Sequence, residues 1–354
     1  NIILSDCIFL CRRSYIVALY WVCDCNCLWF NSNSFRKMYR ICIITVYIGK
    51  FPNYFNMWLE SCRWNPQFDF LLVTDNHVES LPDNVKLLRT DLISLKNRLS
   101  VKLRSDIVLN SPYKLCDYKP SYGLMFEDEL KGYDFWGHCD MDLIWGNLSK
   151  FLNKNLFDSY DKIYRLGHLS LYRNNYKCNT AFLLPHPNGK DFKSVAATDR
   201  PCIFDELNGI GKILEANNFK VYNKEEAADI TFKRYRMTLA ADNNYNHQIF
   251  MIRNGGCYRI AFDGGRLIED EFPYIHMQKR RYENILDPAV RSYIVSIDRF
   301  IPFDSSAITE SIIDRLNPYK GRFYEKCEYH IKNIRFRFSM WNVKRKLTNS
   351  NKHS

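Results

Sequence analysis

Residues 133–148 read YDFWGHCDMDLIWGNL, and this stretch decides the fold class of the chain. Its first half is apolar and aromatic, which predicts a strand over residues 133–139 that is buried in a sheet. Two carboxylates follow at once, Asp140 and Asp142, with one residue between them. Because open α/β sheets bind ligands at the carboxyl ends of their strands, this pair stands where a ligand is expected.

The sequence before this stretch predicts an α/β fold. Residues 41–47 form a continuous β-branched, apolar run, and residues 68–74 and 85–88 are two further apolar runs. Residues 54–62, between the first two runs, have the spacing of a helix. Such alternation is typical of a mixed, mostly parallel sheet that is flanked by helices. We therefore predict an α/β main domain over residues 38–290.

Further elements are expected along the rest of the chain. Helices are predicted at 114–130, 148–156 and 204–217, and strands at 168–172, 181–184, 249–252, 258–262 and 266–268. The last three form a small antiparallel group, because glycine pairs at 255–256 and 264–265 indicate tight turns. Residues 291–354 are expected to form a helical C-terminal extension that ends in a basic tail.

The acidic pair suits a divalent cation. In a regular strand, side chains two residues apart share a face, so Asp140 and Asp142 would reach the same ligand. Carboxylate oxygens are hard ligands for Mg²⁺ or Mn²⁺, which bridge phosphate oxygens and stabilise a departing diphosphate. An isolated Asp-x-Asp is more often a solvated turn. The context favours a metal site here, since an apolar strand precedes the pair and the motif IWGNL (144–148) follows it.

The stretch around the pair resembles the Asp-x-Asp region of GT-A glycosyltransferases, particularly the glycogenin-like and capsule-type bacterial families. In these families the strand is followed by an aliphatic position, a Gly-Asp or Gly-Asn turn and a helix. The run 113–123, YKLCDYKPSYG, is similar to the helix upstream of that motif. The resemblance implies a GT-A fold over the main domain, a nucleotide-diphosphate sugar as donor, and a glycan or lipid-linked acceptor in surface polysaccharide biosynthesis.

The resemblance also implies a metal shell for Mn²⁺ or Mg²⁺. Asp140 and Asp142 would supply two ligands, and the run 272–280, FPYIHMQKR, supplies His276 as the third. Imidazole is an acceptable ligand for Mn²⁺. The alternative, equally supported, is that His276 is a structural histidine at the end of a strand, beside a solvated basic cluster.

Donor contacts follow from the same resemblance. Asp117 matches a nucleotide contact of these families. Their basic phosphate contact falls on Pro120 in this chain, so Lys119 or Lys114 would have to replace it. The full set of expected donor contacts is Asp75, Lys114, Asp117, Lys119 and Lys279.

An inverting enzyme needs a carboxylate base to deprotonate the acceptor hydroxyl. Asp205 and Glu206 are the candidates for this catalytic role, at the start of the helix expected over 204–217. Acids in a first helical turn are also explained by the helix dipole alone.

The net charge of +11 is concentrated at the ends of the chain, where seven basic residues and no acidic residue follow Glu328. A nucleic-acid enzyme would carry its charge across its working face, so nucleic acid is not an expected partner. Residues 329–354 mix apolar and basic side chains and could lie on an anionic membrane surface. A basic helix packed on the domain explains the same composition.

Residues 1–37 are predicted to be a non-native upstream extension or disordered. Met38 is the first methionine and opens the run that resembles the start of a cytoplasmic α/β enzyme. A signal anchor over 14–30 and a metal motif at 23–27 are the alternatives. The eight scattered cysteines from Cys42 onward favour free thiols in a reducing cytoplasm. We therefore expect a cytoplasmic protein, and a tail that docks on an anionic membrane would place it at the inner face of the plasma membrane.

Two other function classes stay open. Another metal-dependent, phosphate-handling transferase could use the same acidic pair, although the sequence has no Gly-x-x-x-x-Gly-Lys-Ser/Thr loop. A non-catalytic, basic membrane-binding protein would act through the tail alone.

Overall fold

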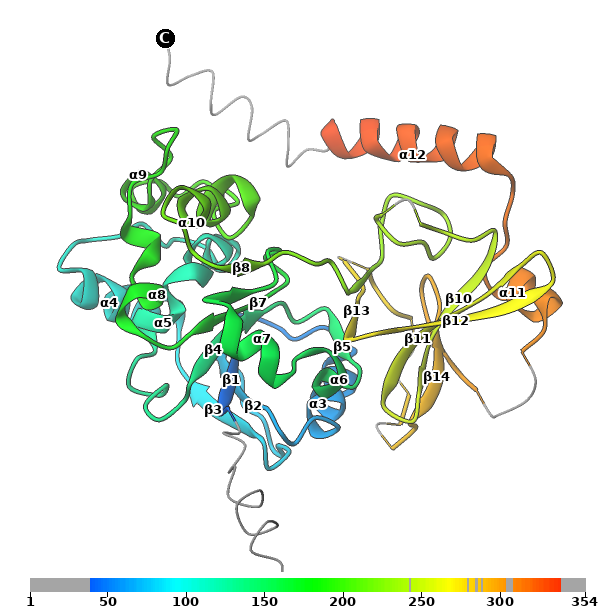
Figure 1. Ribbon diagram of the computed structural model, residues 1–354, viewed down its shortest axis with the longest axis horizontal. Coiled ribbons are helices and arrows are strands. Elements are labelled where there is room, and N and C mark those ends of the chain that lie inside the picture. Colours follow the sequence, from blue (N-terminus) through cyan, green and yellow to red (C-terminus); the bar gives the residue numbers. More distant parts are fainter. Residues whose placement is uncertain are drawn as a thin grey trace, which may run out of the picture. The chain divides into compact units, whose positions relative to one another are not determined.

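The computed structural model describes residues 39–338, apart from 242, 279, 284, 285, 288 and 304–307. Seven strands form a mixed sheet with the order β3-β2-β1-β4-β7-β6-β8 (Figure 1). The first four run parallel, β7 is antiparallel to β4 and β6, and β8 is parallel to β6. This mostly parallel sheet is compatible with a Rossmann-like fold. Its strands are β1 (Ile41–Tyr47), β2 (Asp69–Thr74), β3 (Val85–Arg89), β4 (Phe135–Cys139), β6 (Lys162–Ile163), β7 (Leu169–Arg173) and β8 (Val221–Tyr222).

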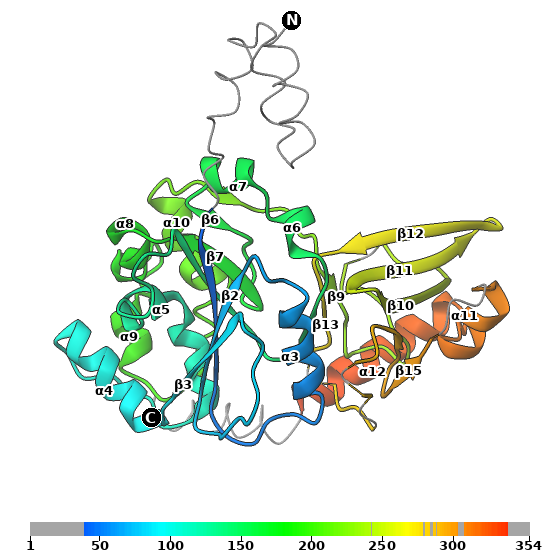
Figure 2. The same cartoon turned by 90° about the horizontal axis from the view of Figure 1, so that it is seen from below.

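Helices cover both faces of this sheet (Figures 1 and 2). On β1, Cys42 and Ile44 pack into the core of one face, and Ile41 and Ile43 pack into the core of the other. Burial on both faces explains why β1 is a continuous apolar run. The first core includes α4 (Leu92–Leu103), α5 (Tyr122–Met125), α9 (Phe192–Ala196) and α10 (Lys212–Ala216); the second includes α3 (Phe55–Arg63), α6 (Leu148–Phe151) and α7 (Lys154–Ser159); α8 (Tyr176–Asn179) follows β7.

Two smaller sheets follow. An antiparallel sheet has the order β12-β11-β10-β14-β15, and a three-stranded sheet has the order β5-β13-β9. Their strands are β5 (Leu143–Trp145), β9 (Ala228–Asp229), β10 (His247–Arg253), β11 (Gly256–Asp263), β12 (Arg266–Phe272), β13 (Tyr274–His276), β14 (Ser292–Val295) and β15 (Phe300–Pro302). Helix α11 (Glu310–Leu316) packs Ile313 against the antiparallel sheet, and α12 (Arg322–Arg337) follows.

Most of the strands expected from the sequence are confirmed, as β1 to β4, β7 and β10 to β12. The strand expected at 181–184 is wrong. Ala181–Leu183 is a 3-10 turn in which Ala181 and Phe182 pack among the helices. A short apolar run fits a buried helical turn as well as a strand, so periodicity alone misassigned it.

Three expected helices are shorter or broken. The helix expected over 114–130 is a 3-10 helix, Pro112–Ser121, followed by the four residues of α5. Pro120 has no N–H to donate, which weakens an α-helix there. Residues 148–156 divide into α6 and α7, because Asn153 caps α7 at Leu156 N. In the 204–217 segment only α10 is regular, since Gly209 interrupts Leu207–Gly211 with a non-helical backbone.

The segment after residue 290 is not wholly helical as expected. Strands β14 and β15 precede α11, and β14 pairs with β10 on the other side of the predicted boundary. The run Tyr293-Ile294-Val295 is short but β-branched and apolar, which suits a strand. Predictions for residues 1–37 and 339–354 lie outside the described residues. Within the described part, no helix combines the length and the apolar character needed to cross a bilayer.

Candidate functional site

A cleft of about 700 Å³ opens at the carboxyl ends of β1 and β4. Val46 to Ile48 line it from the end of β1, and Cys139 to Asp142 line it from the end of β4. Lys119, the pair Asp205 and Glu206, and His276 also face it. This is the edge of the sheet at which open α/β folds bind their ligands.

Strand pairing brings His276 to the acidic pair. Strand β5 begins directly after Asp142 and pairs with β13, with Leu143 opposite His276. The backbone N–H of Met277 donates to the Asp142 carbonyl at 2.9 Å, which fixes the register at this point. Two segments more than 130 residues apart are therefore held side by side at the floor of the cleft.

Asp140, Asp142 and His276 form a cluster that could hold a metal ion. Each offers one ligand atom, and the three atoms lie within 4.8 Å of one another. The side chains of the two aspartates are 34% and 21% exposed, so both are accessible from the cleft. Two carboxylates and one imidazole fit Mn²⁺, and the carboxylates fit Mg²⁺.

Asp229 supports this cluster from behind, and no motif in the sequence marks it. It accepts hydrogen bonds from His276 Nδ1 at 2.7 Å and from Gln278 Nε2 at 2.6 Å. The Nε2 atom of His276 thus faces Asp142, at 3.4 Å from its Oδ1. A carboxylate behind a ligating histidine fixes the ring and increases its basicity. The parallel pairing of β9 with β13 places Asp229 there.

The charge on His276 follows from these two carboxylates. Burial alone would lower its pKa, but Asp142 and Asp229 outweigh burial and raise the pKa to about 10. The imidazolium is therefore the cation of the metal-free cluster. A divalent ion ligated by Nε2 would displace the Nε2 proton, because a metal ligand must offer a lone pair.

Lys119 joins the cluster of Asp140, Asp142 and His276 to the candidate base. Its Nζ donates to Asp140 Oδ1 at 2.6 Å, to Asp205 Oδ2 at 3.0 Å and to the Gly167 carbonyl at 3.0 Å. Burial alone would lower the pKa of Lys119, but Asp140 and Asp205 outweigh burial and raise the pKa well above its usual value. Lys119 is therefore a fixed positive charge in the wall of the cleft.

Glu206 differs electrostatically from its neighbour Asp205. Burial, with the nearby charge of Asp205, raises the pKa of Glu206 to about 7. Burial also raises the pKa of Asp205, while Lys119 opposes that change. Glu206 is therefore a carboxyl group that exchanges its proton near neutral pH, which suits acid–base work.

Lys114 and Asp117 do not reach the cleft, contrary to the expectation that they contact a donor. Both side chains are fully buried and pair with each other at 2.8 Å. Lys114 also donates to the Arg200 carbonyl at 2.8 Å, and Asp117 accepts from the backbone N–H groups of Cys202 and Phe204. Their polar atoms are satisfied inside the protein. The pair therefore does not contact a ligand but fixes the segment 200–204, which leads to Asp205.

Of the other expected donor contacts, Asp75 stands apart from the cleft wall. Asp75 is exposed and accepts a hydrogen bond from Gly49 N at 2.9 Å, so it supports the loop after β1. It is not among the residues that line the cleft. Lys279 lies outside the described residues.

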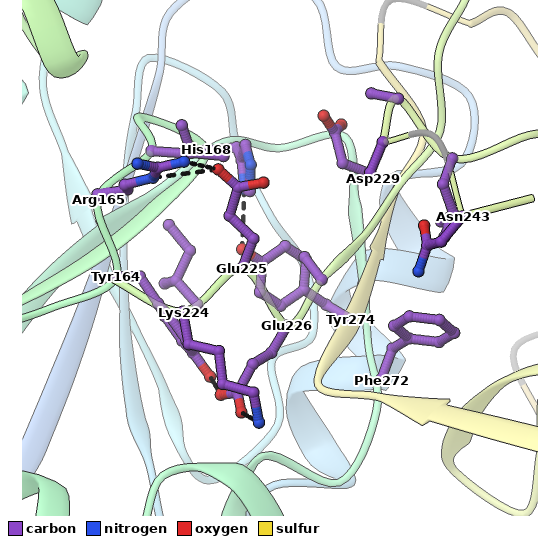
Figure 3. A pocket seen from close by; sticks show the side chains of 16 residues that line it. Tyr164, Arg165, His168, Lys224, Glu225, Glu226, Asp229, Asn243, Phe272 and Tyr274 are labelled. Carbon is purple, nitrogen blue, oxygen red and sulfur yellow. Dashed lines mark hydrogen bonds and ion pairs between the residues drawn. The ribbon is translucent and has the colours of Figure 1, made fainter. Parts of the chain in front are cut away.

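A second cavity of about 110 Å³ reaches Asp229, the residue behind His276 (Figure 3). Asp229 and His168 line it together with charged side chains, of which Arg165 pairs with Glu225. His168 Nδ1 bonds to the Tyr274 hydroxyl at 2.8 Å, while its buried Nε2 has no hydrogen-bond partner among the described residues. Burial, then the charge of neighbouring His276, lowers the pKa of His168 to about 3, so its ring is neutral.

Comparisons with known proteins give matches among solved structures and one family. A crystal structure of a glycosyltransferase involved in the glycosylation of the major capsid of PBCV-1 is 8% identical, with a TM-score of 0.31. The match covers 54% of this chain and 85% of that one, and likeness at this level carries no argument about fold or activity. No curated protein matches the sequence. A family model matches residues 43–304, well over half of the chain, and the protein therefore belongs to the family of unknown function DUF6625.

Proposed function

We propose that the protein is a metal-dependent glycosyltransferase of the GT-A type. It would transfer a sugar from a nucleotide-diphosphate sugar to a hydroxyl group of a glycan or lipid-linked acceptor. The observation that supports this most is the meeting of Asp140, Asp142 and His276 in one cleft at the carboxyl edge of a mostly parallel sheet.

In this proposal the cluster holds Mn²⁺ or Mg²⁺, with Asp229 orienting His276 from behind. The bound ion supplies charge stabilisation to a diphosphate leaving group. Lys119 contributes a second, permanent positive charge beside Asp140. Because the cleft is partly enclosed, these charges act in a medium of lower dielectric constant than water and so interact strongly with a phosphate group.

Glu206 is the proposed general base. Its neighbour Asp205 is already bonded to Lys119, whereas Glu206 lines the cleft with a pKa near neutrality. An ionised Glu206 can accept the proton of an acceptor hydroxyl as that oxygen attacks the sugar. Asp205 then serves to hold Lys119 between the base and the metal ligands.

Thermal shift with nucleotides tests this function. UDP and GDP, each with Mn²⁺, are expected to raise the melting temperature, because a ligand that binds only the folded state stabilises it. The shift should disappear with chelator and in Asp140→Asn. The matched control is Asp83→Asn, because Asp83 is exposed and does not line the cleft. Stabilisation by nucleoside triphosphates alone would instead favour another phosphate-handling transferase.

A further inference from the structure

Helix α12 carries an apolar stripe on its outer face. Phe323, Cys327, Ile331 and Ile334 in the helix, with Phe338 at its C-cap, recur at intervals of three or four residues, which places them on one side. All five are exposed; for example, Phe323 is 82% and Phe338 is 72% exposed. We call these five residues the outer stripe. Scattered exposed apolar side chains are ordinary, but five in register on one helix are not.

The acidic residues of α12 face the protein. Glu325 is buried and pairs with Arg236, and it lies 3.7 Å from Arg234. Glu328 accepts a hydrogen bond from the backbone N–H of Tyr235 at 2.7 Å. These are the only two acids in the helix, so its outer surface has no carboxylate that would oppose an anionic partner.

Basic residues accompany the outer stripe. Arg322, Lys326 and Arg335 are exposed. Lysine and arginine beside an apolar stripe are typical of helices that lie in the interface of a membrane with anionic lipids. With 16 residues, α12 is also too short to span a bilayer, so an in-plane orientation is the one that its length permits.

The inner side of α12 joins this surface to the cleft. Phe336 packs its ring against Phe232 at 5.5 Å, and Tyr324 packs against Tyr235 at 5.1 Å. Phe232 also lines the cleft. The segment 232–236 therefore lines the cleft at its start, through Phe232, and contacts α12 along its length.

We propose that the outer stripe of α12 docks on an anionic lipid surface. A second copy of this chain is a poorer occupant, because a symmetric pairing would bring the same basic side chains together. Lipid headgroups and acyl chains match both the charge and the apolar stripe. The consequence of docking for the acceptor rests on the proposed function. If the protein is a transferase, docking would place the mouth of the cleft close to an acceptor that is anchored in the membrane.

Vesicle sedimentation with the full chain tests the docking. We expect binding to vesicles of equal parts phosphatidylcholine and phosphatidylglycerol, and none to pure phosphatidylcholine. The double variant Ile331→Gln/Ile334→Gln should have a partition coefficient about tenfold or more below that of the wild type, since two apolar contacts with the lipid are lost. The matched control is Ile93→Gln with Val101→Gln, two exposed apolar residues on α4.

A second pair of variants tests the charge. Lys326→Gln with Arg335→Gln should weaken binding to anionic vesicles, and Arg104→Gln with Lys193→Gln, also exposed, should not. All of these positions are on the surface, so unchanged melting temperatures will confirm that the variants fold.

The proposal is overturned by a wild-type chain that does not bind anionic vesicles, or by stripe variants that bind as well as wild type. A concentration-dependent dimer that the stripe variants abolish would assign the surface to a second copy instead. The Mn²⁺-dependent nucleotide shift is measured on the same variants. Stripe variants that lose vesicle binding but keep the nucleotide shift support docking by the outer stripe. A wild-type chain that binds vesicles but shows no nucleotide shift rejects only the proposed transferase function.

Discussion

His276 lies between two carboxylates, and the two contacts differ in kind. Its Nδ1 is 2.7 Å from Asp229, a good hydrogen bond, whereas its Nε2 is 3.4 Å from Asp142. The shorter contact fixes the ring, and the longer one leaves the second nitrogen turned toward the cleft. Metal-binding histidines are commonly oriented in this way by a carboxylate behind them.

Asp229→Asn should therefore weaken metal binding without removing a ligand. We expect the affinity for Mn²⁺ to fall about 10- to 100-fold, because the support of His276 loses its charge. Calorimetric titration of Mn²⁺ measures this directly. The exposed Asp263 provides the control Asp263→Asn, which should titrate like wild type. An unchanged affinity in Asp229→Asn would show that Asp229 only fills space.

The raised pKa of Glu206 predicts how turnover depends on pH. A general base works in its ionised form, so kcat/KM should be low below the pKa of Glu206 and rise through about pH 7. Glu206→Gln should lower kcat by about 10²- to 10⁴-fold and remove this rise. The rate at which nucleoside diphosphate is released from the donor, followed as a function of pH, measures kcat and kcat/KM. Glu225→Gln, on an exposed glutamate beside the second cavity, should keep the wild-type profile.

Among the elements, the meeting of His276 with Asp140 and Asp142 depends on how closely the sheets approach each other. Gly146 follows β5, and its N–H donates to the Pro273 carbonyl at 2.8 Å. A Cβ at this position would lie 2.7 Å from the Phe272 carbonyl oxygen and 3.0 Å from Cys257 N. Both of these are backbone atoms and cannot rotate away, so only glycine fits between the strands.

Gly146→Ala should therefore destabilise the fold by about 1–3 kcal/mol, as overpacked positions generally do. Urea unfolding measures the change. Gly211→Ala is the control, since its added Cβ would meet its nearest neighbour at 3.5 Å, an ordinary contact. Equal stability of Gly146→Ala and wild type would contradict the close approach that holds β5 beside β13.

The sequence predicted the elements whose burial is uniform and missed those that depend on distant partners. Strands β1 and β2 are buried on both faces and read as continuous apolar runs, which periodicity detects. Strand β9 has two residues, and nothing in the sequence shows that Asp229 will lie behind His276. The role of Lys114 was also hidden, because lysine is rarely fully buried unless it is paired, and the resemblance to GT-A enzymes suggested a phosphate contact.

At the scale of the whole molecule, the cleft draws its residues from segments that the chain order keeps apart. Asp140 and Asp142 come from the end of β4, Lys119 from the 3-10 helix before it, and His276 from β13. The resemblance to GT-A enzymes predicted the meeting of His276 with the two aspartates, and the strand pairing accounts for it physically.

The central claim is that Asp140, Asp142 and His276 bind a divalent cation that holds a nucleoside diphosphate. Titration calorimetry of UDP into the protein, with and without Mn²⁺, tests it most directly in the wild type and in Asp142→Asn. We expect binding in the wild type only when Mn²⁺ is present, and a loss of about tenfold or more in affinity in the variant. Equal UDP affinity with and without Mn²⁺, or in both proteins, would contradict it.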